Sequence, residues 1–322
     1  MKGVSVLASL ALCSSIVALP ALGQAFPSHA IRLIVPFAPG GPTDAIARLI
    51  AQRWGESVGQ QVIIDNRVGA NAIIGTALGA KAPADGYTLV MVAFPHGINP
   101  SLYPKIPYDT VKDFAPVVLA TAGPMLLAVY PSVPAGNVKS FIALAKSCPD
   151  ELTCGSSGSG STAHFALELL NHLSGSRIRH VPYKGAAQGM SDLLGGQISM
   201  YFGGVPPLLP HVKTGRLKRL VVSTRERTNS APDIPTIAES GVAGYQVSGW
   251  YGVVAPAGTP REIVAQLNAQ SVAQLRTPAL QEKLAANGAD IVASTPEQFA
   301  SCIAAEITKW EKVIITAGVK VD

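Results

Sequence analysis

The chain has 322 residues, of which 48% are hydrophobic and 14% are charged. This length suits two domains of about 150 residues better than a single core. Lys and Arg exceed Asp and Glu by 25 to 20, which gives a formal net charge of +5. The basic concentration from Lys213 to Arg227 lacks the interleaved aromatic residues of a nucleic-acid-binding surface. We interpret it as a solvated face and expect no nucleic-acid partner.

The N-terminus has the pattern of a secretory signal. Lys2 gives a positive start, residues 4–22 are almost wholly apolar or small, and small residues follow where a signal peptidase would cut. We expect residues 1–25 to be removed by cleavage after Ala25, although cleavage after Gly23 also fits. A membrane anchor is disfavoured because serines and a proline interrupt the apolar run and no basic stop-transfer cluster follows. The sequence therefore predicts an exported protein.

Along the rest of the chain, short β-rich runs alternate with amphipathic helical segments, which is the rhythm of a parallel α/β sheet. The first half predicts strands at 31–36, 61–66, 88–93 and 117–120, with helices at 46–58 and 73–82. The second half predicts strands at 126–129, 152–155, 178–181, 198–202, 217–223 and 251–255, with helices at 140–146, 166–173, 190–194, 208–213, 260–275, 278–287 and 296–317. We expect the chain to cross between two domains near 122–125 and again near 246–250.

Two segments share one design, in which a buried strand is followed by a Gly/Ser-rich loop and a helix start. The first is Phe37–Asp44 and the second is Ser156–His164. Glycine lets the backbone approach a ligand closely, and the first N–H groups of a helix have no partner within the helix. Such a helix start binds carboxylates or phosphates without a charged side chain. The two loops therefore predict a site for a small anion.

The sequence lacks complete enzymatic patterns. The segment Gly155–Ser159 lacks the last glycine of a serine-hydrolase elbow. Residues 158–163 match a dinucleotide fingerprint, but the next strand ends at Tyr183 with no carboxylate for the ribose. His164 and His172 lie two helical turns apart, too far to share a metal ion. We expect no cofactor, no metal and no catalysis.

The cysteines suggest one disulfide. Cys148 and Cys154 flank a short turn, whereas Cys302 stands alone, and an exported protein meets an oxidising compartment. We therefore predict a disulfide between Cys148 and Cys154.

Five motifs follow one another along the chain. They are Val35-Pro36-Phe37-Ala38-Pro39-Gly40-Gly41-Pro42-Thr43-Asp44, Ile98-Asn99-Pro100, Val181-Pro182-Tyr183-Lys184-Gly185, Asp192-Leu193-Leu194-Gly195-Gly196-Gln197 and Ala255-Pro256-Ala257-Gly258-Thr259-Pro260. This ordered series resembles the Bug (Bordetella uptake gene) family, the substrate-binding components of tripartite tricarboxylate transporters. The resemblance runs from about Phe26 to the C-terminus.

The resemblance implies an α/β, two-domain periplasmic-binding-protein fold with a ligand cleft between the domains. It also implies that a carboxylate is held by two pincer loops, 37–44 and 157–164, through main-chain N–H groups and ordered waters. The family binds many acids, including dicarboxylates, citrate-like acids, acidic amino acids and aromatic acids. From the loops and motifs together, the expected ligand-binding residues are Phe37, Ala38, Gly40, Gly41, Pro42, Thr43, Asp44, Phe94, His96, Ser157, Ser159, Gly160, Ser161, Thr162, His164, Tyr183, Lys184 and Gly203.

The sequence departs from the usual family pattern in three places. Pro42 replaces the third glycine of the first loop, and Ala70-Asn71-Ala72-Ile73 replaces a Gly-Gly-Asn run. The strand ending at Phe202 is followed by Gly203 and Gly204 where an acidic residue is common. Without that carboxylate an ammonium group has no evident partner, so amino acids become less favoured ligands. The two glycines would also leave room for a larger ligand.

These observations predict a periplasmic solute-binding protein that captures a small organic carboxylate, a di- or tricarboxylate or an aromatic acid. We expect domain 1 to comprise 26–122 plus 250–322 and domain 2 to comprise 123–249. The expected partners are the membrane subunits of a tripartite tricarboxylate-type transporter, with the receptor itself a monomer. Two alternatives stay open, namely a secreted enzyme acting on the same acid and a sensor subunit that presents the ligand to a signalling partner.

Overall fold

The computed structural model describes residues 26–228 and 232–319. The signal peptide predicted for residues 1–25 lies outside this range. The strands are β1 (Ile31–Val35), β2 (Val62–Asn66), β3 (Thr88–Ala93), β4 (Phe114–Val129), β5 (Thr153–Ser156), β6 (Arg179–Pro182), β7 (Met200–Gly204), β8 (Lys218–Val222), β9 (Ser248–Pro256) and β10 (Asp290–Ile291). The helices are α1 (Pro42–Val58), α2 (Ile73–Ala80), α3 (Pro95–Leu102), α4 (Val138–Ser147), α5 (Thr162–Ser174), α6 (Ala186–Leu194), α7 (Val205–Lys213), α8 (Arg261–Leu275), α9 (Pro278–Ala286) and α10 (Pro296–Ala317).

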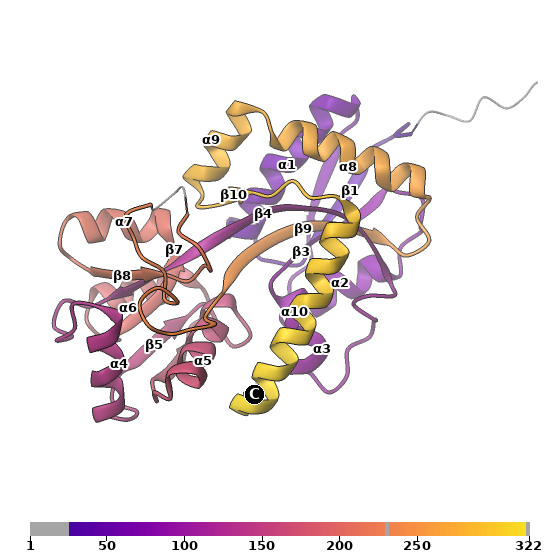
Figure 1. The fold of residues 1–322 in the computed structure, drawn as a ribbon. Coiled ribbons are helices and arrows are strands. Elements are labelled where there is room, and N and C mark those ends of the chain that lie inside the picture. The colour runs from indigo at the N-terminus through magenta and orange to yellow at the C-terminus, as the bar shows by residue number, and fades with distance from the viewer. Residues whose placement is uncertain (1–25, 229–231, 320–322) are drawn as a thin grey trace, which may run out of the picture.

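The strands form one curled sheet in which β4 belongs to both halves. The order is β2-β1-β3-β9-β4-β7-β5-β6, with β8 and β10 also paired to β4. Residues 114–124 of β4 pair with β9, and residues 125–129 pair with β7 and β8. Figure 1 shows β4 and β9 running as long neighbouring strands between the two lobes of the molecule. At the crossing, Gly123 pairs with Gly249 and Pro124 with Ser248.

Local chemistry fixes where the main helices begin and end. Helix α1 has proline at its first position and ends at Gly59, whose left-handed backbone closes the last turn. Helix α5 begins after Ser161, whose side chain accepts a hydrogen bond from the His164 N–H. Helix α10 begins with a capping box between Thr295 and Gln298. Two of these starts, those of α1 and α5, face the site described below.

Helices cover both faces of the sheet, and this sets the walls of the site. Helices α3, α4, α5 and α10 share one continuous core that spans both lobes, in which Phe94, Phe165 and Trp310 pack edge to face. Helices α1, α8 and α9 cover the opposite face of one lobe, and α6 and α7 cover the opposite face of the other. The start of α5 therefore lies on one face of the second lobe, and the starts of α6 and α7 lie on the other.

Most predicted elements are confirmed, including strand 88–93 and helix 296–317 residue for residue. The prediction of separate strands at 117–120 and 126–129 is wrong, because β4 continues without a break through the Gly123-Pro124 pair. Helix α3, which contains Pro100, was not predicted. Among the described residues, none of the helices combines the length and apolar character needed to cross a membrane.

The structure contradicts the predicted disulfide, because Cys148 and Cys154 are free thiols. Cys148 follows the last turn of α4, where its sulfur lies 3.7 Å from Ser147 Oγ. Cys154 points from β5 into the apolar core, and burial raises the pKa of its thiol. A helix end and a buried strand thus direct the two sulfurs into different surroundings.

Candidate functional site

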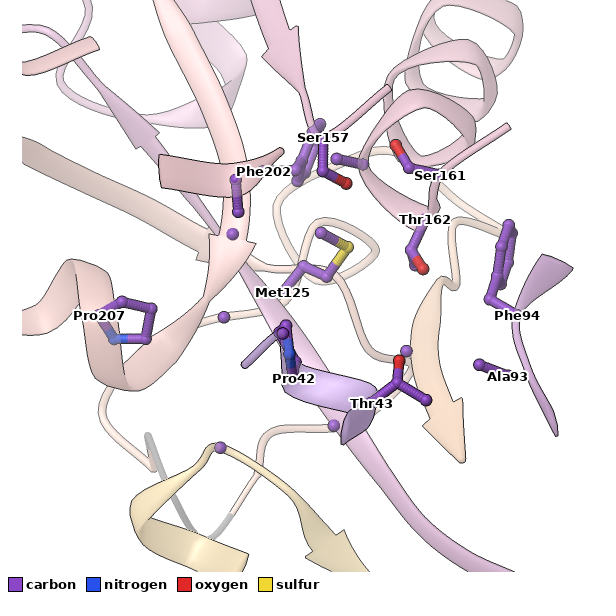
Figure 2. Close-up of a pocket in the computed structure, with 18 of the residues that line it drawn as sticks. Pro42, Thr43, Ala93, Phe94, Met125, Ser157, Ser161, Thr162, Phe202 and Pro207 are labelled. Carbon is purple, nitrogen blue, oxygen red and sulfur yellow. The ribbon is translucent and has the colours of Figure 1, made fainter. Parts of the chain in front are cut away.

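A cavity of about 790 Å³ opens where several strands end and helices begin, between the two lobes (Figure 2). Its wall takes residues from both lobes and from the crossing strands. The residues that line it are Phe37, Gly40, Gly41, Pro42, Thr43, Ala45, Asn71, Ala93, Phe94, Pro95, Gly123, Pro124, Met125, Ser157, Gly158, Ser159, Ser161, Thr162, Ala163, Ala186, Met190, Tyr201, Phe202, Gly203, Gly204, Pro206, Pro207, Gly249, Trp250, Tyr251, Ala286, Asn287 and Gly288. None of these described residues is Lys, Arg, His, Asp or Glu. An anion in this cavity must therefore be held by dipoles.

The first loop is held in shape by Asp44, whose side chain is buried behind it. The Asp44 carboxylate accepts hydrogen bonds from the Gly40 N–H at 2.9 Å, from Asn66 Nδ2 at 2.9 Å and from Arg48 Nε at 2.8 Å. Burial alone would raise the pKa of this carboxyl, but the bonds from Arg48, Gly40 and Asn66 lower it below its usual value. With its oxygens used in this way, Asp44 positions the loop and does not line the cavity.

The second loop rests on two stacked histidines. His164 Nδ1 accepts a hydrogen bond from the Gly160 N–H at 3.2 Å, and its ring stacks on His180 with centroids 3.9 Å apart. His180 Nε2 lies 2.6 Å from Ser156 Oγ, which in turn accepts from the Gly158 N–H at 3.1 Å. Burial, together with the neighbouring His164, lowers the pKa of His180 to about 3. His180 is therefore neutral at physiological pH and acts as a support beneath the loop.

Both loops leave N–H groups free at helix starts. In α1 the first position is Pro42, which has no N–H, so Thr43 and Asp44 carry the first donors that lack an intrahelical partner. In α5 the corresponding donors are the N–H groups of Thr162 and Ala163. Figure 2 shows the side chains of Thr43 and Thr162 directed toward each other across the cavity. The positive ends of two helices thus face one space from opposite lobes.

The structure brings eleven of the expected residues to the cavity wall. They are Phe37, Gly40, Gly41, Pro42, Thr43, Phe94, Ser157, Ser159, Ser161, Thr162 and Gly203. The others lie elsewhere, namely Ala38, Asp44, His96, Gly160, His164, Tyr183 and Lys184.

Three of those outlying residues have clear structural roles. His96, expected to line the cleft, is buried between Tyr108 and Phe114 in the apolar core, and burial lowers its pKa to about 4. Tyr183 donates its hydroxyl hydrogen to Asp192 at 2.7 Å, and burial raises its pKa to about 12. Gly160 packs against Asn71, so that a Cβ at Gly160 would lie only 2.5 Å from Asn71 Nδ2.

Sequence reasoning missed the part of the wall that comes from the crossing strands and the far loops. Asn71, Met125, Met190, Trp250 and Asn287 are examples. Asn71 carried a signal, since it lies in the segment that departs from the family pattern. Asn71, Ala70 and Ala72 all have left-handed backbones, and Asn71 Nδ2 donates to Asn99 Oδ1 at 2.9 Å. The other four lie on elements whose approach to the cavity depends on how the lobes pack.

This architecture, with two α/β lobes joined by crossing strands and a cavity between them, is that of a two-domain periplasmic binding protein. Residues 46–319 match the family model described as the tripartite tricarboxylate transporter family receptor, and the chain belongs to that family. The protein BugT of Bordetella pertussis is 37% identical over 306 residues, covering 94% of each chain.

Solved structures agree with this assignment. The structure of R. palustris Rpa4515 with adipate is 40% identical, with a TM-score of 0.82 over 92% of this chain and 99% of that one. The structure of MatC from Rhodopseudomonas palustris with bound malate is 34% identical, with a TM-score of 0.79 over 90% of this chain and all of that one.

Proposed function

We propose that this protein is an exported periplasmic receptor that binds one small organic carboxylate between its lobes. It then delivers the acid unchanged to the membrane subunits of a tripartite tricarboxylate-type transporter. The observation that carries the proposal is the pair of helix starts, α1 and α5, that aim free N–H groups into a cavity whose described wall has no charged side chain. Relatives with bound adipate and malate support a carboxylate as the ligand.

Hydrogen bonds alone can supply the binding free energy of a micromolar complex, without a salt bridge. A micromolar complex needs about −8 kcal/mol, and a hydrogen bond to a charged group contributes about 1.5–3 kcal/mol. The three main-chain donors of Thr43, Thr162 and Ala163, all in residues that line the cavity, therefore supply the right order of affinity. Hydroxyl groups of Ser157, Ser159 and Ser161 are further donors on the same wall.

Ligand capture is proposed to draw the two lobes together about the crossing strands. Domain 1 would be 26–122 plus 250–322 and domain 2 would be 123–249, with the domain boundaries at the paired glycines Gly123 and Gly249. Because α1 belongs to the first domain and α5 to the second, a carboxylate held by both helix starts links the domains directly. The receptor is proposed to act as a monomer.

An enzymatic role is the less favoured alternative. The buried Ser156–His180 pair lies beneath the loop, with Ser156 fully buried, so that its hydroxyl does not reach the cavity. A binding protein returns its acid unchanged, whereas an enzyme converts it. Mass spectrometry of the acid before and after prolonged incubation with the protein distinguishes the two.

The decisive test adds a negative charge beside the proposed anion site while keeping the helix cap. In Ser161→Asp the new carboxylate is as good an N-cap as serine, so unfolding free energy should change by less than about 0.5 kcal/mol. Repulsion between charges about 4 Å apart near a protein surface is about 4 kcal/mol, so affinity for the co-purified acid should fall at least ~100-fold. Calorimetry with the acid released from the wild-type protein measures it.

The matched control is Ser161→Asn, which has nearly the same shape and also caps helices, but carries no charge. It should lose less than about tenfold in affinity. Equal binding by the Asp and Asn variants would place the carboxylate away from α5 and contradict the proposal. Gly160→Asp is a poorer choice, because Gly160 has a left-handed backbone with φ +80 and its Cβ would collide with Asn71.

A further inference from the structure

The cavity has two chemically different ends. One end carries the starts of α1 and α5 with their free N–H groups. The other, which we call the distal wall, comprises Met125, Ala186, Met190, Tyr201, Phe202, Gly203, Gly204, Pro206 and Pro207. In Figure 2, Thr43, Thr162 and Phe94 lie toward one side of the cavity, Phe202 and Pro207 toward the other, and Met125 between them. A ligand anchored at the first end must therefore extend along an apolar surface.

Helix α7 brings a third helix start to the cavity, but two of its first three residues lack an N–H. Its sequence begins Val205-Pro206-Pro207, and neither proline has an N–H. Pro206 and Pro207 themselves line the distal wall, so pyrrolidine rings occupy the place where main-chain donors would otherwise face a ligand oxygen. Val205 is thus the one residue among the first three of α7 that carries an N–H, and pyrrolidine rings take the place of the next two donors.

Strand β7, which precedes α7, also contributes no charged side chain to the cavity. A Cβ at Gly203 would lie 2.9 Å from Leu208 Cδ1 and 2.9 Å from Tyr201 Cε1, so this space is already filled. The expectation that Gly203 and Gly204 leave room for a larger ligand is therefore corrected for Gly203, although Gly203 still provides no carboxylate for an ammonium group. Tyr201 is the distal wall's one polar side chain, and burial, with a smaller effect of Cys154, raises its pKa to about 12. It stays a neutral phenol.

Helix α6 contributes Ala186 and Met190 to the same wall. The cation nearest in sequence, Lys184, does not line the cavity, and its N–H donates to the Gln188 side chain. A second ligand carboxylate at this end would lose its hydration against Met125, Met190 and Phe202. The Tyr201 hydroxyl and the Val205 N–H would be the compensating donors. Burying an ion without enough donors is strongly unfavourable, whereas a hydrocarbon group gains from the same contact.

Resting on the proposed function, we propose that the ligand is a monocarboxylate with an apolar body, such as a substituted aromatic or alicyclic acid or a medium-chain fatty acid. Its carboxylate sits between the starts of α1 and α5, and its body lies against the distal wall. The cavity volume of about 790 Å³ leaves space for a ring beyond the carboxylate. This chain therefore differs from its relatives with bound adipate and malate in the polarity of the ligand it selects.

The test compares acids of equal outline that differ only at the distal end. We compare 4-methylbenzoate with terephthalate, and hexanoate with adipate, by calorimetry on ligand-free wild-type protein. In each pair a methyl group is replaced by a carboxylate. We expect the monoacid of at least one pair to bind ten or more times tighter than its diacid. Equal or tighter binding of both diacids overturns the inference but leaves the proposed function intact. Failure of all four acids to bind overturns both.

A charge placed on the distal wall should reverse the preference. Met190→Lys, on the half-buried face of α6, supplies a cation for a second carboxylate and should favour terephthalate over 4-methylbenzoate by at least tenfold. The control Met190→Leu keeps an apolar wall and should keep the wild-type order. An unchanged preference in a folded Met190→Lys protein, as judged by circular dichroism, would contradict the placement of the apolar body.

Discussion

Asp44 illustrates how a charged residue can serve a site without touching the ligand. Asp44 is 2% exposed, and its carboxylate accepts hydrogen bonds from Gly40, Arg48 and Asn66, so the shape of the first loop depends on its ionisation. The Asp44 carboxylate accepts every one of these hydrogen bonds. Only its ionised form can accept them all, because a protonated carboxyl group carries a hydrogen on one of its oxygens. The loop should therefore be sensitive to acid.

This gives a prediction for pH dependence. The pKa of Asp44 is lowered below its usual value of 3.8, so its contribution to stability is fully present above that value and is lost as the pH falls through the lower, folded-state pKa. We expect Asp44→Asn to destabilise the protein at pH 6, with the difference from wild type shrinking below about pH 4. Urea unfolding of both proteins from pH 3 to 7 measures this. A difference that is independent of pH would show that the charge of Asp44 is immaterial.

At the scale of elements, the entry to α2 stores backbone strain beside the cavity. Ala70, Asn71 and Ala72 have φ values of 47, 49 and 73, a region that costs a residue with a Cβ about 1–2 kcal/mol. Asn71 lines the cavity, and its carbonyl accepts a hydrogen bond from Asn99 at 2.9 Å. The strain thus places one polar side chain between the lobes.

Relieving that strain should stabilise the protein. Ala70 is exposed, so Ala70→Gly loses no buried contact and should raise the free energy of unfolding by up to about 1 kcal/mol. The control Ala77→Gly, in the interior of α2, should lower it by about 0.5–1 kcal/mol. Chemical denaturation gives both values. If Ala70→Gly destabilises as much as Ala77→Gly does, the left-handed turn is not strained.

For the whole molecule, the point at which β4 and β9 cross between the lobes is closely packed. A Cβ at Gly123 would lie 2.3 Å from the Gly288 carbonyl oxygen, in the loop after α9. A Cβ at Gly249, the strand partner of Gly123, would meet its nearest neighbour at 3.9 Å. Gly288 in turn approaches Pro206 of α7, so this loop lies between the crossing strands and the second lobe.

We therefore expect Gly123→Ala to impair closure and Gly249→Ala to leave it intact. The first variant must displace the loop at Gly288 and should weaken binding of the co-purified acid at least ~10-fold, about 1.4 kcal/mol. The second makes an ordinary van der Waals contact and serves as the control. Calorimetry gives the affinities, and small-angle scattering with and without the acid reports compaction. Equal affinities for the two variants would argue against a closure that depends on this contact.

The sequence by itself determined the class of protein, most of its elements and the two helix starts at which we propose the carboxylate binds. These properties are local, since the α1 and α5 starts depend on Pro42, Ser161 and the glycines around them, and the strands depend on short apolar runs. The same local logic failed at α3, a helix that contains Pro100 and packs against α10, and at Cys148 and Cys154, whose thiols are free.

Only the tertiary structure decided which side chains form the cavity beyond those loops. Asn71, Met125, Met190, Trp250 and Asn287 are far apart in the sequence and meet because β4 and β9 run through both lobes. The placement of α6 and α7 on the face opposite α5 made one end of the cavity apolar. The polarity of the distal wall depends on which helices pack on the same face of the sheet. That packing is a long-range property that no short sequence motif encodes.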